Sequence, residues 1–170
     1  MKILFATDSL FADVPKKILS HGLNAKIQKL SIPASGTLEL GMSVVYRVRS
    51  MLNPPQVLLL SVGTNDTKLI TEIFYLELRK ILSFCVNLNI IFLCLPLPFG
   101  RLASDDKIKE MNDRINECSY YAFNLNYKHS DLSFDRLHLS NKCITDKLRT
   151  IKKMLNLTVS NLVFGNENWS

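Results

Sequence analysis

Three short polar segments hold the side chains of this 170-residue chain that are best suited to acyl-transfer chemistry. Residues 7–9 (Thr-Asp-Ser) supply a hydroxyl, residues 63–66 (Gly-Thr-Asn-Asp) an amide, and residues 135–138 (Asp-Arg-Leu-His) an imidazole with a carboxylate. A serine hydroxyl is a weak nucleophile unless a neighbouring base takes its proton. An imidazole is such a base when a carboxylate on its other ring nitrogen fixes the tautomer. Together, the three segments contain the parts needed for nucleophilic catalysis.

Histidine is scarce in this chain, and that narrows the choice of base. Of the three histidines, His21 ends a predicted helix and His129 lies in a polar loop. Only His138 has an aspartate, Asp135, three residues before it. One turn of chain at that spacing would place the carboxylate on the imidazole Nδ1–H. The same spacing is also common in surface pairs that have no catalytic role.

The remaining candidates are residues that would stabilise negative charge. The Asn65 amide follows a buried run of residues and could donate to a developing oxyanion. Gly36 lies in a loop where a backbone N–H could approach a substrate closely. Each also has a simpler interpretation, with Asn65 and Gly36 as ordinary turn residues and Ser9 as a helix cap.

The elements that would position these residues alternate along the chain. Short apolar runs and one alternating run, at residues 25–30, predict strands, and apolar residues at helical spacing predict helices. The expected strands are 2–6, 25–30, 56–62, 89–95 and a weak fifth strand at 123–127. The expected helices are 14–21, 38–52, 69–86, 107–122 (with Ser104 as its cap) and 139–155.

This order predicts an α/β fold, a three-layer α/β/α sandwich around a central, mostly parallel sheet of flavodoxin-like type. We expect one domain over residues 1–155 and a C-terminal tail over 156–170. Ligands bind beyond the C-terminal ends of the strands in such sheets. The polar segments 7–9 and 63–66 follow two of these strands, and 135–138 precedes the last helix, so we expect all three at this edge.

Composition excludes several other classes of protein. No Gly-rich phosphate loop is present, and the four cysteines lack the C-x-x-C spacing of zinc sites, so we expect no metal and no cofactor. The net charge of +6 comes from basic residues spread along the chain, which is only weak support for a nucleic-acid partner. The apolar runs 3–6 and 90–95 are too short for a signal peptide or a membrane span, so we expect an intracellular protein with no transmembrane segment.

The order Ser9, Gly36, Asn65, His138 resembles the SGNH hydrolases, also called the GDSL-type esterase/lipase superfamily. Residues 63–66 match the Gly-x-Asn-Asp motif of that family in full, and residues 135–138 match its Asp-x-x-His motif. The resemblance covers roughly residues 2–155. Residue 7 is Thr where the family has Gly in its Gly-Asp-Ser motif, and the block II glycine is Gly36, with Gly41 as the alternative.

The resemblance implies a role for each matching residue. Ser9 would be the nucleophile, His138 the base, and Asp135 the residue that orients His138. The oxyanion hole would consist of the Ser9 and Gly36 N–H groups and the Asn65 side chain. Asp8 would be structural.

It also implies hydrolysis of an ester through an acyl-serine intermediate, without a metal. The substrate would be a small acyl ester or an acetylated carbohydrate. The alternative is a weak or inactive SGNH-like binding module, of viral or retroelement type, that contacts nucleic acid or a protein. Two departures from the family pattern leave room for that alternative. Thr7 replaces a glycine in a tight turn, and Arg136 puts a cation beside His138, where it would face solvent or bind an anionic group of the substrate.

Overall fold

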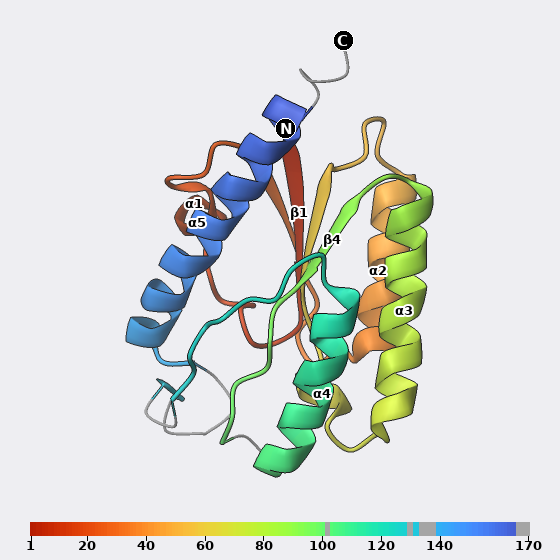
Figure 1. The fold of residues 1–170 in the computed structure, drawn as a ribbon, viewed down its shortest axis with the longest axis vertical. Coiled ribbons are helices and arrows are strands. Elements are labelled where there is room, and N and C mark those ends of the chain that lie inside the picture. Colours follow the sequence, from red (N-terminus) through yellow and green to blue (C-terminus); the bar gives the residue numbers. More distant parts are fainter. Residues whose placement is uncertain (101–102, 129–130, 133–138, 166–170) are drawn as a thin grey trace.

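Four strands of four to six residues form the centre of the computed structural model, and helices cover both faces (Figure 1). The structure describes residues 1–100, 103–128, 131–132 and 139–165. Its strands are β1 (Lys2–Thr7), β2 (Lys26–Ser31), β3 (Val57–Ser61) and β4 (Ile91–Cys94). Its helices are α1 (Lys16–Ser20), α2 (Thr37–Arg49), the 3₁₀ turn η1 (Thr64–Asp66), α3 (Thr71–Asn87), α4 (Asp105–Cys118) and α5 (Asn141–Gly165).

All strand pairs in the sheet are parallel, and the strand order is β2-β1-β3-β4. Every residue of β3 is buried, as expected for a strand with helices over both of its faces. The chain leaves β1 toward β2 on one side and comes back to β3 on the other. The end of β1 is therefore the switch point of the sheet, where α/β folds bind their ligands.

Side chains of alternate strand residues build two separate cores. Leu4, Ala6, Leu58 and Leu60 belong to the core that includes buried residues of α2, α3 and α4. Their neighbours Ile3, Phe5, Val57 and Leu59 belong to the core that includes residues of α1 and α5. Figure 1 shows these two groups of helices on opposite sides of the sheet. The three-layer α/β/α arrangement and the parallel sheet are confirmed.

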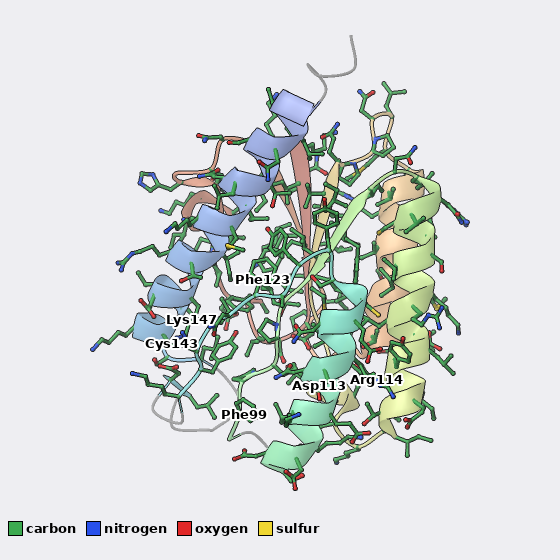
Figure 2. The ribbon with its side chains drawn as sticks, in the orientation of Figure 1. Phe99, Asp113, Arg114, Phe123, Cys143 and Lys147 are labelled. Carbon is green, nitrogen blue, oxygen red and sulfur yellow. The ribbon has the colours of Figure 1, made fainter. Side chains whose placement is uncertain are left out.

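The expected fifth strand is wrong, because residues 123–127 form no strand. Phe123 lies beneath α5 (Figure 2), and Phe123 and Leu125 are both buried in the core on that face of the sheet. Two hydrogen bonds tie the chain just after α4 to β4. The Tyr120 N–H donates to the Phe92 carbonyl at 2.8 Å, and the Cys94 N–H donates to the Ser119 hydroxyl at 2.9 Å. Asn126 then takes a left-handed conformation (φ 48°), which interrupts an extended run.

The last helix is longer than expected, because α5 continues ten residues beyond Leu155 to Gly165. The extension is held in place by side chains: Asn156 Oδ1 accepts from the Asn24 N–H at 2.9 Å, and Asn156 Nδ2 donates to the Gly22 carbonyl at 2.8 Å. Val159 is buried in the core under the helix. The first ten residues of the expected tail are therefore part of α5.

The other helix predictions are confirmed to within a few residues at each end. The Ser104 hydroxyl accepts from the Lys107 N–H at 3.2 Å, so Ser104 caps α4 as its position predicted. None of the helices in the described residues is long and apolar enough to cross a membrane.

Candidate active site

Asp8 fixes the turn that carries Ser9. The carboxylate is fully buried, and its two oxygens accept from the Leu10 N–H at 3.0 Å and from the Thr64 N–H at 3.2 Å. The second bond ties the loop after β1 to the loop after β3. Ser9 is half-buried and follows directly at the switch point of the sheet. The structural role expected for Asp8 therefore agrees with its contacts.

Thr7, the departure from the family glycine, fits its position without strain. It is the last residue of β1, where it pairs in register with Ser31 and Ser61. The non-glycine residues with positive φ in the described part of the chain are Ala34, Asn89 and Asn126, so Thr7 is not among them. A β-branched residue suits such a strand position.

Gly63 allows the chain to turn from β3 into η1. Its φ is 113°, in the left-handed region that favours glycine. A side chain there would also meet Leu97 and Phe74, with Cδ1 and Cε2 each 3.1 Å from the Cβ position. The turn exposes Asn65, whose Nδ2 donates to the Ser35 carbonyl at 2.8 Å. An amide nitrogen carries two hydrogens, and this bond uses one of them.

Asp66 connects the same turn to the start of α2, a role that the sequence did not suggest. Its Oδ2 accepts from the Thr37 N–H at 2.9 Å and from the Thr37 hydroxyl at 2.6 Å. Burial raises the pKa of the Asp66 carboxyl, although the two bonds from Thr37 act in the opposite direction. The motif contains this aspartate, but its partner lies 29 residues away and no local pattern predicts that pairing.

Gly36 lies against this carboxylate. A Cβ atom at Gly36 would be 2.7 Å from Asp66 Oδ1, so a side chain is excluded unless Asp66 moves. The Gly36 N–H, an expected oxyanion donor, donates to Glu39 Oε2 at 2.5 Å. This contact caps the N-terminus of α2 and occupies the donor in this structure. Gly41, the alternative glycine, lies within α2, where a Cβ atom would be 3.0 Å from the Ile81 side chain.

Asp135 and His138 lie outside the described residues, but the structure shows where the chain on either side of them is anchored. Leu132 and Leu139 form an antiparallel bridge, and the Ser140 N–H donates to the Asp131 carbonyl at 2.8 Å. Leu139, next to His138, and Leu10, next to Ser9, belong to the same buried core. The sequence neighbours of the predicted nucleophile and base therefore share one cluster.

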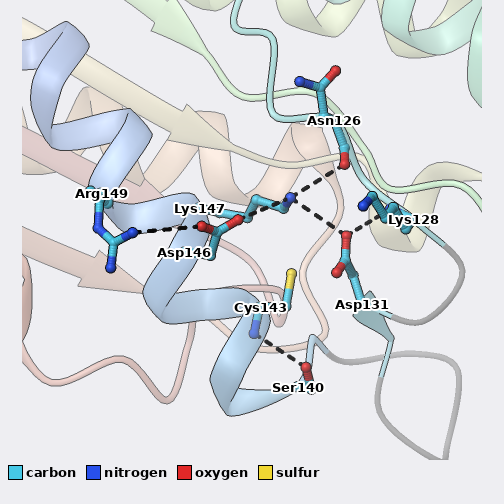
Figure 3. Close-up of polar contacts among 8 residues, drawn as sticks. All are labelled: Asn126, Lys128, Asp131, Ser140, Cys143, Asp146, Lys147 and Arg149. Carbon is cyan, nitrogen blue, oxygen red and sulfur yellow. Dashed lines mark hydrogen bonds and ion pairs between the residues drawn. The ribbon is translucent and has the colours of Figure 1, made fainter.

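A buried lysine holds the segment that leads toward Asp135 (Figure 3). Lys147 Nζ lies 3.3 Å from the Asn126 carbonyl oxygen and 3.5 Å from carboxylate oxygens of both Asp131 and Asp146. Its side chain is only 6% exposed, and a lysine is rarely buried to that degree without a charged partner. Asp131 also accepts from the Lys128 N–H at 2.6 Å. These contacts fix the segment against the first turns of α5.

The cysteines are poor alternatives to Ser9 as the nucleophile. All four are free thiols and buried. Burial raises the pKa of Cys85 to about 12 and of Cys143, in the first turn of α5, to about 11 (Figure 2). The pKa values of Cys94 and Cys118 are raised as well, mainly by burial. Since the thiolate is the reactive form, these thiols are inert near neutral pH.

Among the residues with described positions, no group of three or more His, Cys, Asp or Glu side chains could hold a metal ion. The chemistry that the described loops support is that of a serine, an amide and backbone N–H groups. Bonds between side chains and backbone bring the loops after β1, β2 and β3 together at one edge.

No protein-family model and no curated protein matches this chain. Its structure, however, is similar to solved esterases and lipases. The esterase EstA from Pseudoalteromonas sp. superposes with a TM-score of 0.70 at 17% identity, covering 91% of this chain and 98% of EstA. A GDSL-like lipase from Bacteroides thetaiotaomicron VPI-5482 gives a TM-score of 0.71 at 13% identity, covering 92% and 88% of the two chains.

A third structure, AlinE4, is an SGNH-hydrolase family esterase. It gives a TM-score of 0.63 at 16% identity and covers 96% of this chain and 95% of its own. Identities this low establish a shared fold and not a shared substrate. The coverage of both chains means that the similarity extends over nearly the whole molecule. This protein therefore has the α/β fold of the SGNH hydrolases.

Proposed function

We propose that the protein is a serine-dependent carboxylic ester hydrolase. Three loops are joined at the switch point of the sheet by the contacts Asp8–Thr64, Asn65–Ser35 and Asp66–Thr37, and Ser9 lies beside the first of them. This arrangement carries the proposal, because it places a hydroxyl and an amide donor on neighbouring loops of a fold used by esterases. In this scheme, Asp135 and His138 complete a triad and Asp135 orients the imidazole.

The reaction would proceed in two steps. Ser9 Oγ attacks the ester carbonyl carbon as His138 takes its proton, and the tetrahedral oxyanion binds the Ser9 N–H, the Gly36 N–H and the Asn65 amide. The C–O bond to the alcohol then breaks, and His138 gives the proton to the leaving oxygen. Water, deprotonated by His138, attacks the acyl-serine, and the acid leaves as Ser9 regains its proton.

The test compares hydrolysis of p-nitrophenyl acetate by the wild type and by Ser9→Ala, with Ser20→Ala, at the end of α1, as the matched control. We expect Ser9→Ala and His138→Ala to lower kcat by at least about 10³-fold, and Ser20→Ala to have no effect. A fluorophosphonate probe should label Ser9; among the neighbours, EstA was solved inhibited by monoethylphosphonate. Turnover that survives Ser9→Ala, together with no label on Ser9, would refute the proposal.

One contact favours the alternative of a catalytically weak binding module. The Gly36 N–H already donates to Glu39 Oε2 at 2.5 Å, so one of the proposed oxyanion donors is occupied. If the wild type shows no Ser9-dependent turnover, nucleic-acid binding across a salt series tests this alternative. Affinity that does not change with salt would argue against phosphate contacts.

A further inference from the structure

A cavity of about 470 Å³ adjoins the proposed oxyanion hole. Its lining includes Asn65 and Thr64 from η1, Thr67 and Lys68 just after it, and Ser104 and Lys107 from the start of α4. The volume is in the range of small-molecule sites in proteins. Because Asn65 belongs to both the cavity and the proposed oxyanion hole, a molecule in the cavity would lie beside the scissile carbonyl group.

The chemistry of this lining is polar and cationic. Two lysines, two threonines, a serine and an asparagine offer hydrogen-bond donors, and within the described part of the chain no carboxylate lines the cavity. Asp105 and Asp106, in the first turn of α4, are exposed and are not part of the lining. An aliphatic acyl chain would gain little in such a cavity, whereas an anionic group would gain charge-assisted hydrogen bonds.

Lys107 is held in place and is not a freely moving surface lysine. Its Nζ donates to the Leu69 carbonyl at 2.6 Å and to the Thr71 hydroxyl at 3.0 Å. An ammonium group has three donors, so these bonds leave one for a ligand. Both partners are neutral, which leaves the positive charge without a carboxylate partner among them. Because Lys107 is already ordered, a ligand that binds it causes little further loss of side-chain conformational entropy.

Lys68 brings a second positive charge to the cavity. It is exposed and belongs to the lining. Its charge would add to that of Lys107 without a matching negative charge in the lining.

We infer that this cavity binds an anionic group, a carboxylate or phosphate, on the acyl or the alcohol part of the ester substrate. The inference rests on the proposed esterase function, because Asn65 connects the cavity to the reaction. It narrows the expected substrates from small acyl esters and acetylated carbohydrates to those that carry a negative charge.

The experiment compares esters that differ in one charge. For the acyl side, kcat/KM is measured with p-nitrophenyl hemisuccinate and p-nitrophenyl butyrate. For the alcohol side, it is measured with 4-(carboxymethyl)phenyl acetate and 4-methylphenyl acetate. We expect the wild type to prefer the anionic ester of at least one pair by about three- to tenfold, as two solvent-accessible charge pairs would give. The preference should shrink as salt is raised.

Lys107→Met and Lys68→Met should each reduce this preference, measured as the ratio of kcat/KM for the anionic ester to kcat/KM for the neutral ester, at least twofold. Lys109→Met is the matched control on α4, because Lys109 is exposed and pairs with Asp113 outside the cavity. If Lys107→Met fails to fold, Lys68→Met alone decides. The inference would be overturned if the wild type had equal kcat/KM for the anionic and the neutral ester of each pair. It would also be overturned if Lys109→Met lost as much of the preference as Lys107→Met and Lys68→Met do.

Failure of the inference is distinguishable from failure of the proposed function. If no ester shows Ser9-dependent turnover, the proposed esterase function is refuted. Binding of monoethyl succinate to Ser9→Ala then tests separately whether the cavity binds an anion. Chemical-shift changes at Asn65 and Lys107 that disappear in Lys68→Met would support the cavity as an anion site. The absence of such changes at millimolar ligand would overturn it.

Discussion

At the scale of single residues, the Gly36 N–H is the group on which the proposed chemistry and the local structure compete. It donates to the exposed Glu39 carboxylate, so an oxyanion bound at Gly36 would have to displace that side chain. The contact stabilises the start of α2 in the usual way of a capping glutamate. The same contact would lower the rate of ester hydrolysis, because a carboxylate is a strong competitor for an N–H donor.

We predict that Glu39→Ala raises kcat/KM for p-nitrophenyl acetate by about three- to tenfold and lowers the free energy of unfolding by about 1 kcal/mol, through loss of the cap. Glu39→Gln should have a kcat/KM between those of the wild type and Glu39→Ala, because an amide oxygen accepts a hydrogen bond more weakly than a carboxylate does. Steady-state kinetics and urea unfolding check both effects. Glu110→Ala, which removes an exposed carboxylate of α4, is the control. A kcat/KM at or below that of the wild type in Glu39→Ala would contradict the prediction.

At the scale of elements, α5 anchors the segment that precedes Asp135. Lys147 connects the second turn of the helix to Asp131 and to the Asn126 carbonyl, while Ser140 is tied to the Asp131 carbonyl. Buried ion pairs contribute little net stability, but removing one partner leaves a buried charge without compensation. The pair is therefore better understood as fixing the positions of Asn126 and Asp131 than as a source of stability.

Lys147→Met should lower the free energy of unfolding by about 1–3 kcal/mol, since the partly buried Asp131 carboxylate loses its cation and keeps the bond from the Lys128 N–H. It should also lower kcat of Ser9-dependent hydrolysis by about 10²-fold with KM nearly unchanged, if Asp131 and Asn126 position the proposed base. Urea unfolding and kinetics well below the melting temperature measure the two effects. Lys153→Met, at an exposed position of α5, should change neither.

A second substitution shows whether Lys147 acts through its partner. In Lys147→Met/Asp131→Asn, the charge that Lys147→Met leaves behind is removed. The double variant should therefore be more stable than Lys147→Met alone. If the loss of stability in the double variant equalled the sum of the losses in Lys147→Met and Asp131→Asn, the two residues would act independently.

At the scale of the whole molecule, the C-terminal part of α5 completes the core on one face of the sheet. Beyond Leu155, Asn156 bonds to the chain between α1 and β2, and Thr158 bonds to the Tyr121 hydroxyl at 2.7 Å. Val159 belongs to the same core as Phe5 and Leu59. These contacts join the last helix to segments from the first and last thirds of the chain.

A chain that ends at Leu155 should therefore be less stable than the full chain by roughly 3–5 kcal/mol, from the lost burial of Val159 and the lost hydrogen bonds. A chain that ends at Gly165 retains these contacts and is the control. Thermal and urea unfolding of the three chains measure the difference. Equal stability of the chain ending at Leu155 and the full chain would support residues 1–155 as the complete domain.

Much of the fold follows from local patterns. Apolar runs predicted β1, β3 and β4, alternation predicted β2, and the Ser104 cap and the proline at the start of α1 marked helix boundaries. The strand expected at residues 123–127 was wrong, because Phe123 and Leu125 are buried in one core without strand pairing. The end of α5 was missed because Asn156 and Thr158 look polar in the sequence, and their partners lie far away along the chain.

Residue types and spacing, which are local properties, predict the fold class, the order of the elements and the residues proposed for catalysis: Ser9, Asn65 and the Asp135–His138 pair. Three other features are visible only in the folded chain. Asp66 bonds to the start of α2, Glu39 occupies the Gly36 N–H, and Lys68 and Lys107 line a cavity beside Asn65. Such contacts join residues from separate loops, and only the folded sheet brings those loops to one edge.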